Sequence, residues 1–263
     1  MKYIGSLNDW FTDRPLVERV AAFVRLGIRH LEVRGWRGLA MADLHVECYR
    51  LGATLVATSD EGMGCLADPM DNDQGLRAWQ ESLELAESYG IKHLYVFSNQ
   101  VDGQGQVRSL SAPYPEAKQR TNLYDQTAQL LKLVEQTDVQ LWAKGLSRFN
   151  SGAAPLIHSA QTAAGWVKHF DHPQLRLAFD CYQQQRDSGN LIWNLVAHHG
   201  LYPVIHIADV PTGQEPGTGE INFPSLRTTL RELAFDGYVG LAFKPSTTEA
   251  EALARTRKIF PLE

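Results

Sequence analysis

The sequence predicts a single (β/α)8 barrel, and three observations support this fold class. Short runs rich in β-branched and aromatic residues alternate without a break with longer segments whose apolar residues recur at helical spacing. Eight strand candidates fit into 263 residues, the usual size of one such barrel. No stretch rich in proline, glycine and serine divides the chain. We therefore expect residues 1–263 to form one domain, with a doubly wound open sheet as the alternative.

Eight segments have the composition of buried parallel strands, because they are short, largely apolar and bounded by polar or turn-forming residues. They are 3–7, 30–34, 54–59, 93–99, 140–146, 175–182, 203–210 and 238–245. Four of the intervening segments show clear helical spacing, and three of these end in glycine, as a helix C-cap favours; they are 16–27, 76–90, 122–138 and 223–237. Parallel strands joined by helical crossovers are the expected result.

Composition excludes several classes of protein. The net charge of −5 is spread along the chain without a basic run, so a nucleic-acid partner has no support. No apolar stretch approaches the ~18 residues needed to cross a bilayer, and the first residues lack the apolar core of a secretion signal, so we expect a cytoplasmic protein with no membrane partner. Cys48, Cys65 and Cys181 are too few and too widely spaced for a disulfide framework or a thiolate metal site.

Charged residues gather where the predicted strands end, which is where (β/α)8 barrels carry their active sites. Lys144, Asp180 and His206 belong to otherwise apolar strands, and a charge on a packed barrel wall must be paired or solvated. These three are our candidate acid/base or carbonyl-polarising groups. The candidate substrate-binding residues near the strand ends are Glu32, Trp36, Gln183, Gln185, Arg186 and Lys244. The long polar segment 100–120 is interpreted as an active-site loop or lid.

Three stretches, 179–191, 204–226 and 237–253, resemble hydroxypyruvate isomerase, within the xylose-isomerase-like barrels that include sugar isomerases, epimerases and endonuclease IV. The most specific stretch contains "IADVPTGQEPGTGEIN". The resemblance implies a (β/α)8 barrel with a divalent metal at its mouth, held by two glutamates, an aspartate and a glutamine or histidine. It also implies isomerisation of a hydroxy-carbonyl substrate, in which the metal polarises the carbonyl and the glutamates move a proton.

The positions of the metal ligands depart from this family pattern. Lys144 stands at the position of the fifth-strand glutamate and Ala242 at that of the eighth-strand glutamate, while Asp180 and His206 match. Two ligands are too few for a divalent cation, and Lys144 adds a positive charge where the ion would lie. We therefore expect no metal and no other cofactor. If Lys144 has a structural rather than a catalytic role, it is a counter-ion for the retained Asp180.

The rim of the barrel, in contrast, largely matches the family. Gln183 replaces a usual histidine, but the positions that match the pattern are Gln185, Arg186, Gly189, Asn190, Glu215, Glu220 and Lys244. Glu215 is thereby a further candidate substrate-binding residue. Alternatively, Glu215 and Glu220 serve stability, by pairing with Arg186 or by capping the helix that starts near Phe223.

Two hypotheses for function follow. In the first, the protein is an enzyme of the isomerase, epimerase or lyase type that acts on a small hydroxy-carbonyl sugar or keto acid. Lys144 or Lys244 would polarise the carbonyl directly or through a Schiff base, although an Asp180 partner argues against the latter. A cationic patch of Lys144, Lys244, Arg186 and His206 would favour an anionic ligand. In the second, the barrel is a catalytically inactive ligand-binding or partner subunit. The sequence leaves open whether it forms a homo-oligomer.

Overall fold

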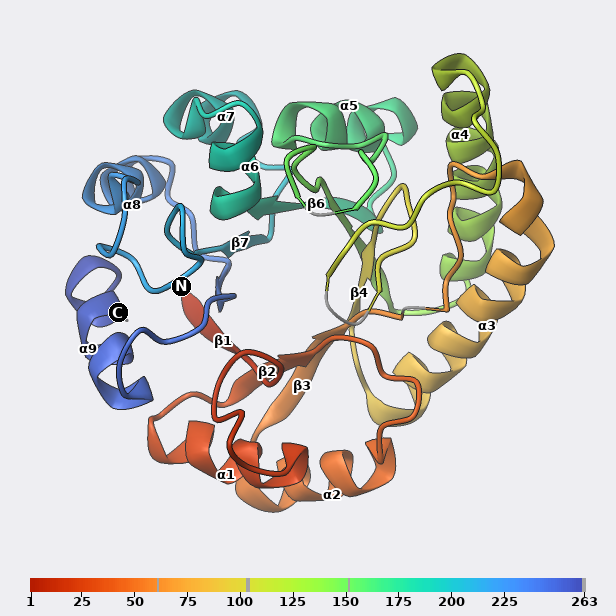
Figure 1. The fold of residues 1–263 in the computed structure, drawn as a ribbon. Coiled ribbons are helices and arrows are strands. Elements are labelled where there is room, and N and C mark those ends of the chain that lie inside the picture. The colour runs from red at the N-terminus through yellow and green to blue at the C-terminus, as the bar shows by residue number, and fades with distance from the viewer. Residues whose placement is uncertain (61, 103–104, 151, 262–263) are drawn as a thin grey trace.

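The eight predicted strands form a closed parallel barrel in chain order. A computed structural model describes residues 1–60, 62–102, 105–150 and 152–261. Each strand pairs with its neighbours in sequence, and β8 closes the ring by pairing with β1 (Figure 1). This closure confirms the predicted fold class and excludes the open sheet. The strands are β1 Lys2–Ser6, β2 His30–Val33, β3 Thr54–Thr58, β4 His93–Val96, β5 Gln140–Lys144, β6 Leu175–Asp180, β7 Val204–His206 and β8 Tyr238–Leu241.

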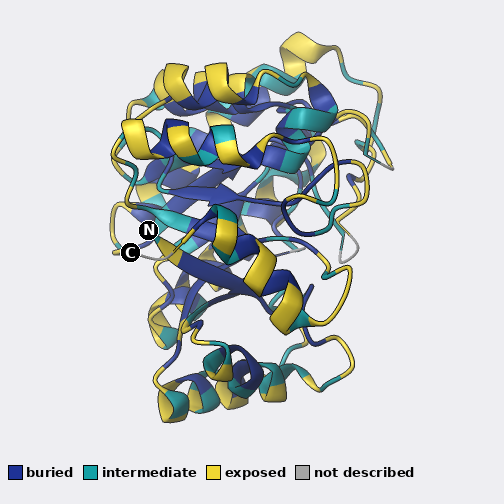
Figure 2. Cartoon of the chain, turned by 90° about the vertical axis from the view of Figure 1, so that its left-hand side faces the viewer, coloured by how far each residue is buried: buried dark blue, intermediate teal, exposed yellow. Residues whose placement is uncertain are grey.

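Helices surround the barrel, and Figure 2 shows their exposed outer faces over the buried strands. They are α1 Leu16–Arg25, α2 Met41–Leu51, α3 Asn72–Tyr89, α4 Glu116–Val134, α5 Ala160–Phe170, α6 Cys181–Asp187, α7 Leu191–Ala197, α8 Phe223–Glu232 and α9 Glu249–Ile259, with a short 3-10 helix η1 Pro69–Asp71. Gly52 and Gly90 end α2 and α3 in the left-handed conformation that glycine permits. Within the described ranges, no helix has the length and apolar character needed to cross a membrane.

The strands end earlier than the apolar runs predict. The predicted strand 175–182 stops at Asp180, because that side chain accepts a hydrogen bond from the backbone N–H of Gln183 and begins α6. The predicted loop 100–120 is also shorter, since α4 begins at Glu116. Residues 103–104 of that loop lie outside the described part. Strand ends and helix starts thus meet more tightly at the barrel mouth than periodicity alone indicates.

The apolar side chains form two separate clusters. The larger one lies between the strands and the helices, as the layers of a barrel require. The smaller one fills the barrel interior and includes Ile4, Val56, Tyr95, Trp142 and Val204. The ring of Trp142, in this cluster, also stacks on the ring of His93 at 3.9 Å between centroids. These side chains pack the interior, and the charged residues Lys144, Asp180 and His206 lie at the C-terminal ends of their strands.

Strand register places the candidate residues on the inner wall. Asp180 is paired with His206 and His206 with Gly240, so all three lie at one level. Lys144 is the last residue of β5 and is paired with Ala178, two residues before Asp180. Residues paired in a parallel sheet point to the same side, so the side chains of Lys144, Asp180 and His206 converge on the interior.

Candidate functional site

A compact group of charged side chains lies at the C-terminal mouth of the barrel, with Lys144 in its middle. We call this group the Lys144 centre. The Nζ atom of Lys144 lies 2.6 Å from Oδ2 of Asp180 and 2.8 Å from Nδ1 of His206. The three side chains come from the ends of β5, β6 and β7. The structure therefore brings together the three candidate catalytic residues. The side chain of Lys144 is 13% exposed, against 8% for Asp180 and 4% for His206, so Lys144 has the most access to a ligand.

Two further residues complete this Lys144 centre on its buried side. The hydroxyl of Tyr95 donates to Oε2 of Glu32 at 2.6 Å and contacts Nε2 of His206 at 2.8 Å. Oε2 of Glu32 also lies 3.4 Å from Nε2 of His206. Glu32, predicted as a substrate-binding residue, is thus a buried partner of His206. The sequence analysis did not select Tyr95. The pattern that indicates it is the alternation of inward and outward side chains along β4, which directs residues 93 and 95 inward.

The positive and negative charges of this centre stabilise one another. Burial raises the pKa of Glu32, but His206, Tyr95 and Lys144 outweigh it and lower that pKa to about 2. Burial likewise opposes ionisation of Asp180, yet Lys144 and His206 hold its pKa well below the usual range. Burial and Lys144 lower the pKa of His206, but Glu32 and Asp180 raise it above its ordinary value overall. Burial and Glu32 raise the pKa of Tyr95, which stays neutral. Both carboxylates are therefore ionised at neutral pH.

Gly240 makes the position of His206 possible. A Cβ atom at Gly240 would lie 2.2 Å from Cδ2 and 2.8 Å from Nε2 of His206. The imidazole therefore occupies the volume that any other residue at this position of β8 would fill. The close approach of ring and strand directs Nε2 towards Tyr95 and Nδ1 towards Lys144.

The residues at the mouth do not fit the divalent metal that the family resemblance implies. The ammonium of Lys144 contacts both Asp180 and His206, the two side chains that match the ligand pattern. Ala242 follows β8 and offers no donor. Among the described residues, no group of three or more His, Cys, Asp or Glu side chains is arranged to hold a metal ion. In its ammonium form a lysine has no lone pair, so it cannot bind a metal ion.

The predicted rim residues of α6 hold the loop that follows β5. Oε1 of Gln183 accepts hydrogen bonds from the backbone N–H of Ser147 and from the side chain of Asn150, both at 2.8 Å. Arg186 donates to Oδ1 of Asn150 at 2.8 Å and contacts the hydroxyl of Tyr182 at 3.3 Å. Gln183 and Arg186 thus shape the mouth by positioning this loop.

The contacts of Glu215 are those of a residue that stabilises the fold. Its side chain is fully buried and accepts hydrogen bonds from the backbone and hydroxyl of Ser246, at 2.8 and 2.6 Å. Arg255 lies 3.0 Å from the same carboxylate. These contacts tie the loop after β7 to the loop after β8. They support the alternative role in stability, with Arg255 in place of the expected partner Arg186.

The other rim candidates lie at the periphery. Glu220 accepts a hydrogen bond from Gln185 at 3.2 Å, and Asn222, rather than a glutamate, caps the helix that begins at Phe223. Lys244 is exposed, and within the described ranges its side chain has no hydrogen bond or ion pair with the Lys144 centre. Of the four residues of the expected cationic patch, Lys144 and His206 are in direct contact among the described residues.

Trp36 lies near the end of β2 but is engaged by its neighbours. Its Nε1 donates to Oγ of Ser82 at 3.2 Å, and the guanidinium of Arg37 lies 4.5 Å from its ring centroid. Arg37 in turn pairs with the buried Asp60 at 2.7 Å. The indole thus belongs to the packing of the loop after β3, and its exposed face remains the candidate for stacking on a sugar.

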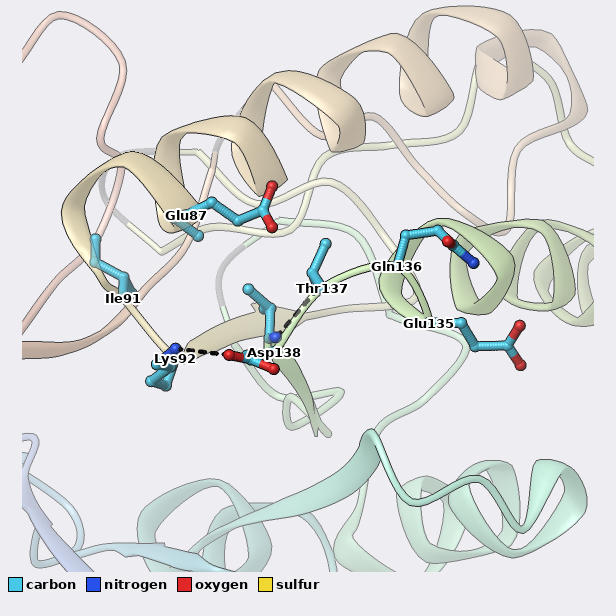
Figure 3. Close-up of a pocket in the computed structure, with 9 residues that line it drawn as sticks. Glu87, Ile91, Lys92, Glu135, Gln136, Thr137 and Asp138 are labelled. Atoms are coloured by element: carbon cyan, nitrogen blue, oxygen red, sulfur yellow. Dashed lines mark hydrogen bonds and ion pairs between the residues drawn. The ribbon is translucent and has the colours of Figure 1, made fainter.

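Cavities elsewhere on the molecule are less suited to chemistry. A cavity of ≈ 410 Å³ lies between α3 and α4 at the opposite end of the barrel, where Lys92 and Asp138 precede β4 and β5 (Figure 3). In this cavity Lys92 and Asp138 form an ion pair 3.4 Å long, while Glu87 and Glu135 lie apart from that pair. We assign the site to the Lys144 centre because buried, mutually perturbed charges converge there.

These features define a class: a (β/α)8 barrel with an ionised centre at the C-terminal ends of its strands. The family model described as Xylose isomerase-like TIM barrel matches residues 20–259. The chain belongs to the xylose isomerase-like TIM barrel family, which confirms the resemblance found in the sequence.

Individual relatives span nearly the whole chain. A Danio rerio protein named "Putative hydroxypyruvate isomerase" is 33% identical over 276 residues, covering 98% of this chain and 95% of the relative. The 2-oxo-tetronate isomerase of Haemophilus influenzae is 24% identical over 258 residues, covering 93% of each. The crystal structure of an AP endonuclease, family 2, from Brucella melitensis has a TM-score of 0.86 at 20% identity, covering 98% of this chain and 99% of that one. At this identity the solved structure shows a shared fold.

Replacing Gly240 with alanine tests the packing of His206. We expect Gly240→Ala to lower the free energy of unfolding by about 1–3 kcal/mol, because the new methyl group overlaps the imidazole. Gly165→Ala, in α5 with no heavy atom near the new methyl group, is the matched control and should be neutral or stabilising. Urea unfolding of the three chains measures this. Equal stability of the two variants would contradict the assigned packing.

The pH dependence of stability tests the charge of Glu32. Its pKa of about 2 lies below the unfolded value of 4.5, so its contribution is fully present above pH 4.5 and is lost as the pH falls towards 2. Between pH 2 and 4.5 the unfolding free energy of the unaltered chain should rise with pH. We expect this rise to be smaller in Glu32→Gln, by up to about 1.4 kcal/mol per pH unit. The exposed Glu84→Gln is the control. Unfolding curves from pH 2.5 to 5 with unchanged slope would refute the assignment.

Proposed function

We propose that this protein is an isomerase of a small, anionic hydroxy-carbonyl compound, such as a keto acid or sugar acid, and that the Lys144 ammonium acts in place of the family's divalent metal. The observation that carries the proposal is the position of Nζ of Lys144, 2.6 Å from Asp180, at the barrel mouth. The relatives named as hydroxypyruvate and 2-oxo-tetronate isomerases support the substrate class.

The chemistry of such a reaction needs a positive charge beside the carbonyl oxygen. Removal of a proton from the neighbouring carbon gives an enediolate, and a fixed cation stabilises its oxygen. An ammonium has three N–H groups, and two of those on Lys144 are directed at Asp180 and His206. The third has no hydrogen-bond partner in the part of the chain that the structure describes, and it can donate to a ligand oxygen at the mouth. Lys144 therefore contributes what the metal contributes elsewhere, with a smaller charge.

Asp180 serves this reaction as a counter-ion rather than as a base. Its Oδ2 contacts Lys144, its Oδ1 accepts the backbone N–H of Gln183 at 2.9 Å, and its pKa is lowered. A carboxylate held on both oxygens by donors is a weak proton acceptor. The same contact argues against a Schiff base at Lys144, because a carboxylate favours the charged ammonium.

The second candidate function is a catalytically inactive ligand-binding or partner subunit. One observation favours it: Asp180, His206 and Glu32 all have partners within the protein, so the ionic network is complete without a ligand. Hydrogen-deuterium exchange at a substrate carbon distinguishes the two functions, since an inactive barrel has no means of removing that proton.

Elemental analysis tests metal independence. Because Lys144 and Ala242 occupy two of the four ligand positions, we expect no stoichiometric divalent metal after dialysis. The double variant Lys144→Glu, Ala242→Glu supplies both missing carboxylates and should gain a rise in melting temperature with Mn²⁺ or Mg²⁺, since a ligand that binds the native state stabilises it. Retention of about one Mg, Mn or Zn per chain by the unaltered protein would contradict the proposal.

Proton exchange tests the proposed reaction. In D2O we expect at least one anionic hydroxy-carbonyl acid from a panel with hydroxypyruvate, tartronate semialdehyde and 2-oxo-tetronate to exchange its carbon-bound proton, as NMR detects. Hydroxypyruvate itself should turn over slowly, because the carboxylates that move the proton in the family are absent. Lys144→Met should slow the exchange by about 100-fold or more.

The exposed Lys168→Met on α5 is the matched control, and it should leave exchange unchanged. Calorimetry on the same panel reports binding separately from exchange. Binding without any exchange would support the inactive subunit, and exchange that ignores Lys144 would overturn the role given to this residue.

A further inference from the structure

The Lys144 centre by itself has no excess of positive charge for an anionic ligand. Asp180 lies 2.6 Å from the ammonium of Lys144, and the ionised Glu32 lies 3.4 Å from His206. These two carboxylates balance the cations of the centre, so a ligand carboxylate gains little from its net charge. A mouth that binds a keto acid or sugar acid therefore needs a further cation.

A small cavity adjoins this centre, between the loops that follow β2, β3 and β4. Arg34, Ser59 and Phe97 line it, one from each loop. Phe97 packs against the interior cluster that contains Tyr95, so the cavity opens onto the barrel interior on the mouth side of Tyr95. Its volume is ≈ 40 Å³. One water-sized sphere occupies about 10–15 Å³, so the space accepts about three non-hydrogen atoms, as many as a carboxylate has.

Arg34 has the donors that recognise a carboxylate. Its backbone N–H donates to Oδ1 of Asn8 at 2.6 Å, and its Nη2 donates to Oδ1 of Asp9 at 2.7 Å. These contacts fix the residue, while Nε and Nη1 have no hydrogen-bond partner among the residues that the structure describes. A guanidinium has five N–H groups, and two of the open ones can bind a carboxylate through parallel N–H···O bonds.

A second polar group of this cavity also lacks a partner. Ser59 is 8% exposed, yet its hydroxyl makes no hydrogen bond within the described ranges of the chain. Its carbonyl, in contrast, accepts the N–H groups of Gly35 and Trp36. A buried hydroxyl without a partner is destabilising, and a ligand oxygen in the cavity would remove that penalty. Arg34 and Ser59 thus offer donors from two adjacent loops.

Two acidic residues line the same cavity, and protein donors bind both. Oδ2 of Asp60 lies 2.7 Å from Nη2 of Arg37, and the Asp60 side chain is fully buried. Oδ1 of Asp102 accepts the backbone N–H of Gln106 at 2.9 Å. Arg34 is the basic residue among the described residues that line the cavity. Its guanidinium is therefore the charged group there that still has donors for an anion.

Tyr95 relates Arg34 to Lys144. Nζ of Lys144 lies 5.9 Å from the ring centroid of Tyr95. The positive charge of Arg34 partly offsets the rise in the pKa of Tyr95 that burial and Glu32 cause. Because the interaction between charges falls with distance, both cations lie near this side chain. In a 2-keto acid the carboxylate is bonded directly to the carbonyl carbon, so two neighbouring cations suit its two adjacent groups.

We propose that Arg34 is the carboxylate-binding and specificity-determining residue of this site, with Ser59 as a second donor, and that it selects 2-keto acids over the corresponding neutral sugars. Arg34 binds the carboxylate in the cavity, and this contact holds the neighbouring carbonyl oxygen at the Lys144 ammonium. The catalytic use of this binding rests on the proposed isomerase function.

Pairs of ligands that differ only at the carboxylate test this selection. Dihydroxyacetone carries a CH2OH group where hydroxypyruvate has its carboxylate, and erythrulose does so for 2-oxo-tetronate. By calorimetry on the unaltered chain, we expect at least one acid to bind about 10-fold or more tightly than its neutral counterpart. Binding of neither acid would overturn the proposal, as would equal affinities within both pairs.

Arg34→Gln should lower the affinity for the acid by about 10-fold or more and change that for the neutral ligand by less than about 2-fold. Arg50→Gln is the matched control and should change neither. Arg50 is also exposed and ion-paired, to Glu47 at 2.7 Å, but it lies at the end of α2 that precedes β3, opposite the mouth. Equal losses for acid and neutral ligand in Arg34→Gln would contradict the assignment.

Ser59→Ala removes a single oxygen and decides the matter if Arg34→Gln does not fold. It should lower the affinity for the acid by about 3-fold or more, with Ser88→Ala on the exposed face of α3 as its control. An unchanged affinity in Ser59→Ala would remove this residue from the site.

Proton exchange separates this inference from the proposed function. Acid binding that depends on Arg34, without exchange at a substrate carbon, would leave the inference standing and remove the isomerase function. Exchange of an acid at the same rate and affinity in Arg34→Gln would leave the isomerase function standing and overturn the role of Arg34.

Discussion

The placement of one ammonium between Asp180 and His206 is the interaction on which the barrel mouth depends. The two acceptors are buried, and a buried carboxylate without a partner is strongly destabilising, by about 3–5 kcal/mol when one member of a buried pair is removed. Lys144 meets this need with contacts of 2.6 and 2.8 Å. In this chain an ammonium contacts both Asp180 and His206, whereas the family resemblance implies a centre that a divalent metal holds together.

The rest of the fold holds this contact in place. Interior packing around Trp142 fills the barrel below the charges, and Gly240 leaves room for the imidazole of His206. The surrounding loops are held by buried carboxylates. Asp209 accepts backbone N–H groups of its own loop, and Glu215 binds Ser246 and Arg255. These contacts hold the loops around the mouth in position, which a site built on short hydrogen bonds requires.

Replacing a divalent ion by a lysine changes the chemistry that the mouth can perform. A metal polarises an oxygen without exchanging protons, but an ammonium can both polarise an oxygen and give up a proton. Hydrogen bonds link Lys144 through His206 and Tyr95 to Glu32 inside the protein. Under the proposed function, the lysine therefore supplies a smaller positive charge than the metal and also a group that can exchange protons.

The sequence by itself determined the eight strands, the barrel and the three charged residues at its mouth, because alternating composition and strand-end position are local properties that each segment carries alone. It did not determine where the strands end, since Asp180 begins a helix through a side-chain contact. Only the tertiary structure decided that Tyr95 joins the centre, that Gly240 accommodates His206, and that Glu215 binds Arg255. Tyr95 and His206 are 111 residues apart. Contacts at such separations depend on closure of the barrel and on strand register, and no local pattern specifies either.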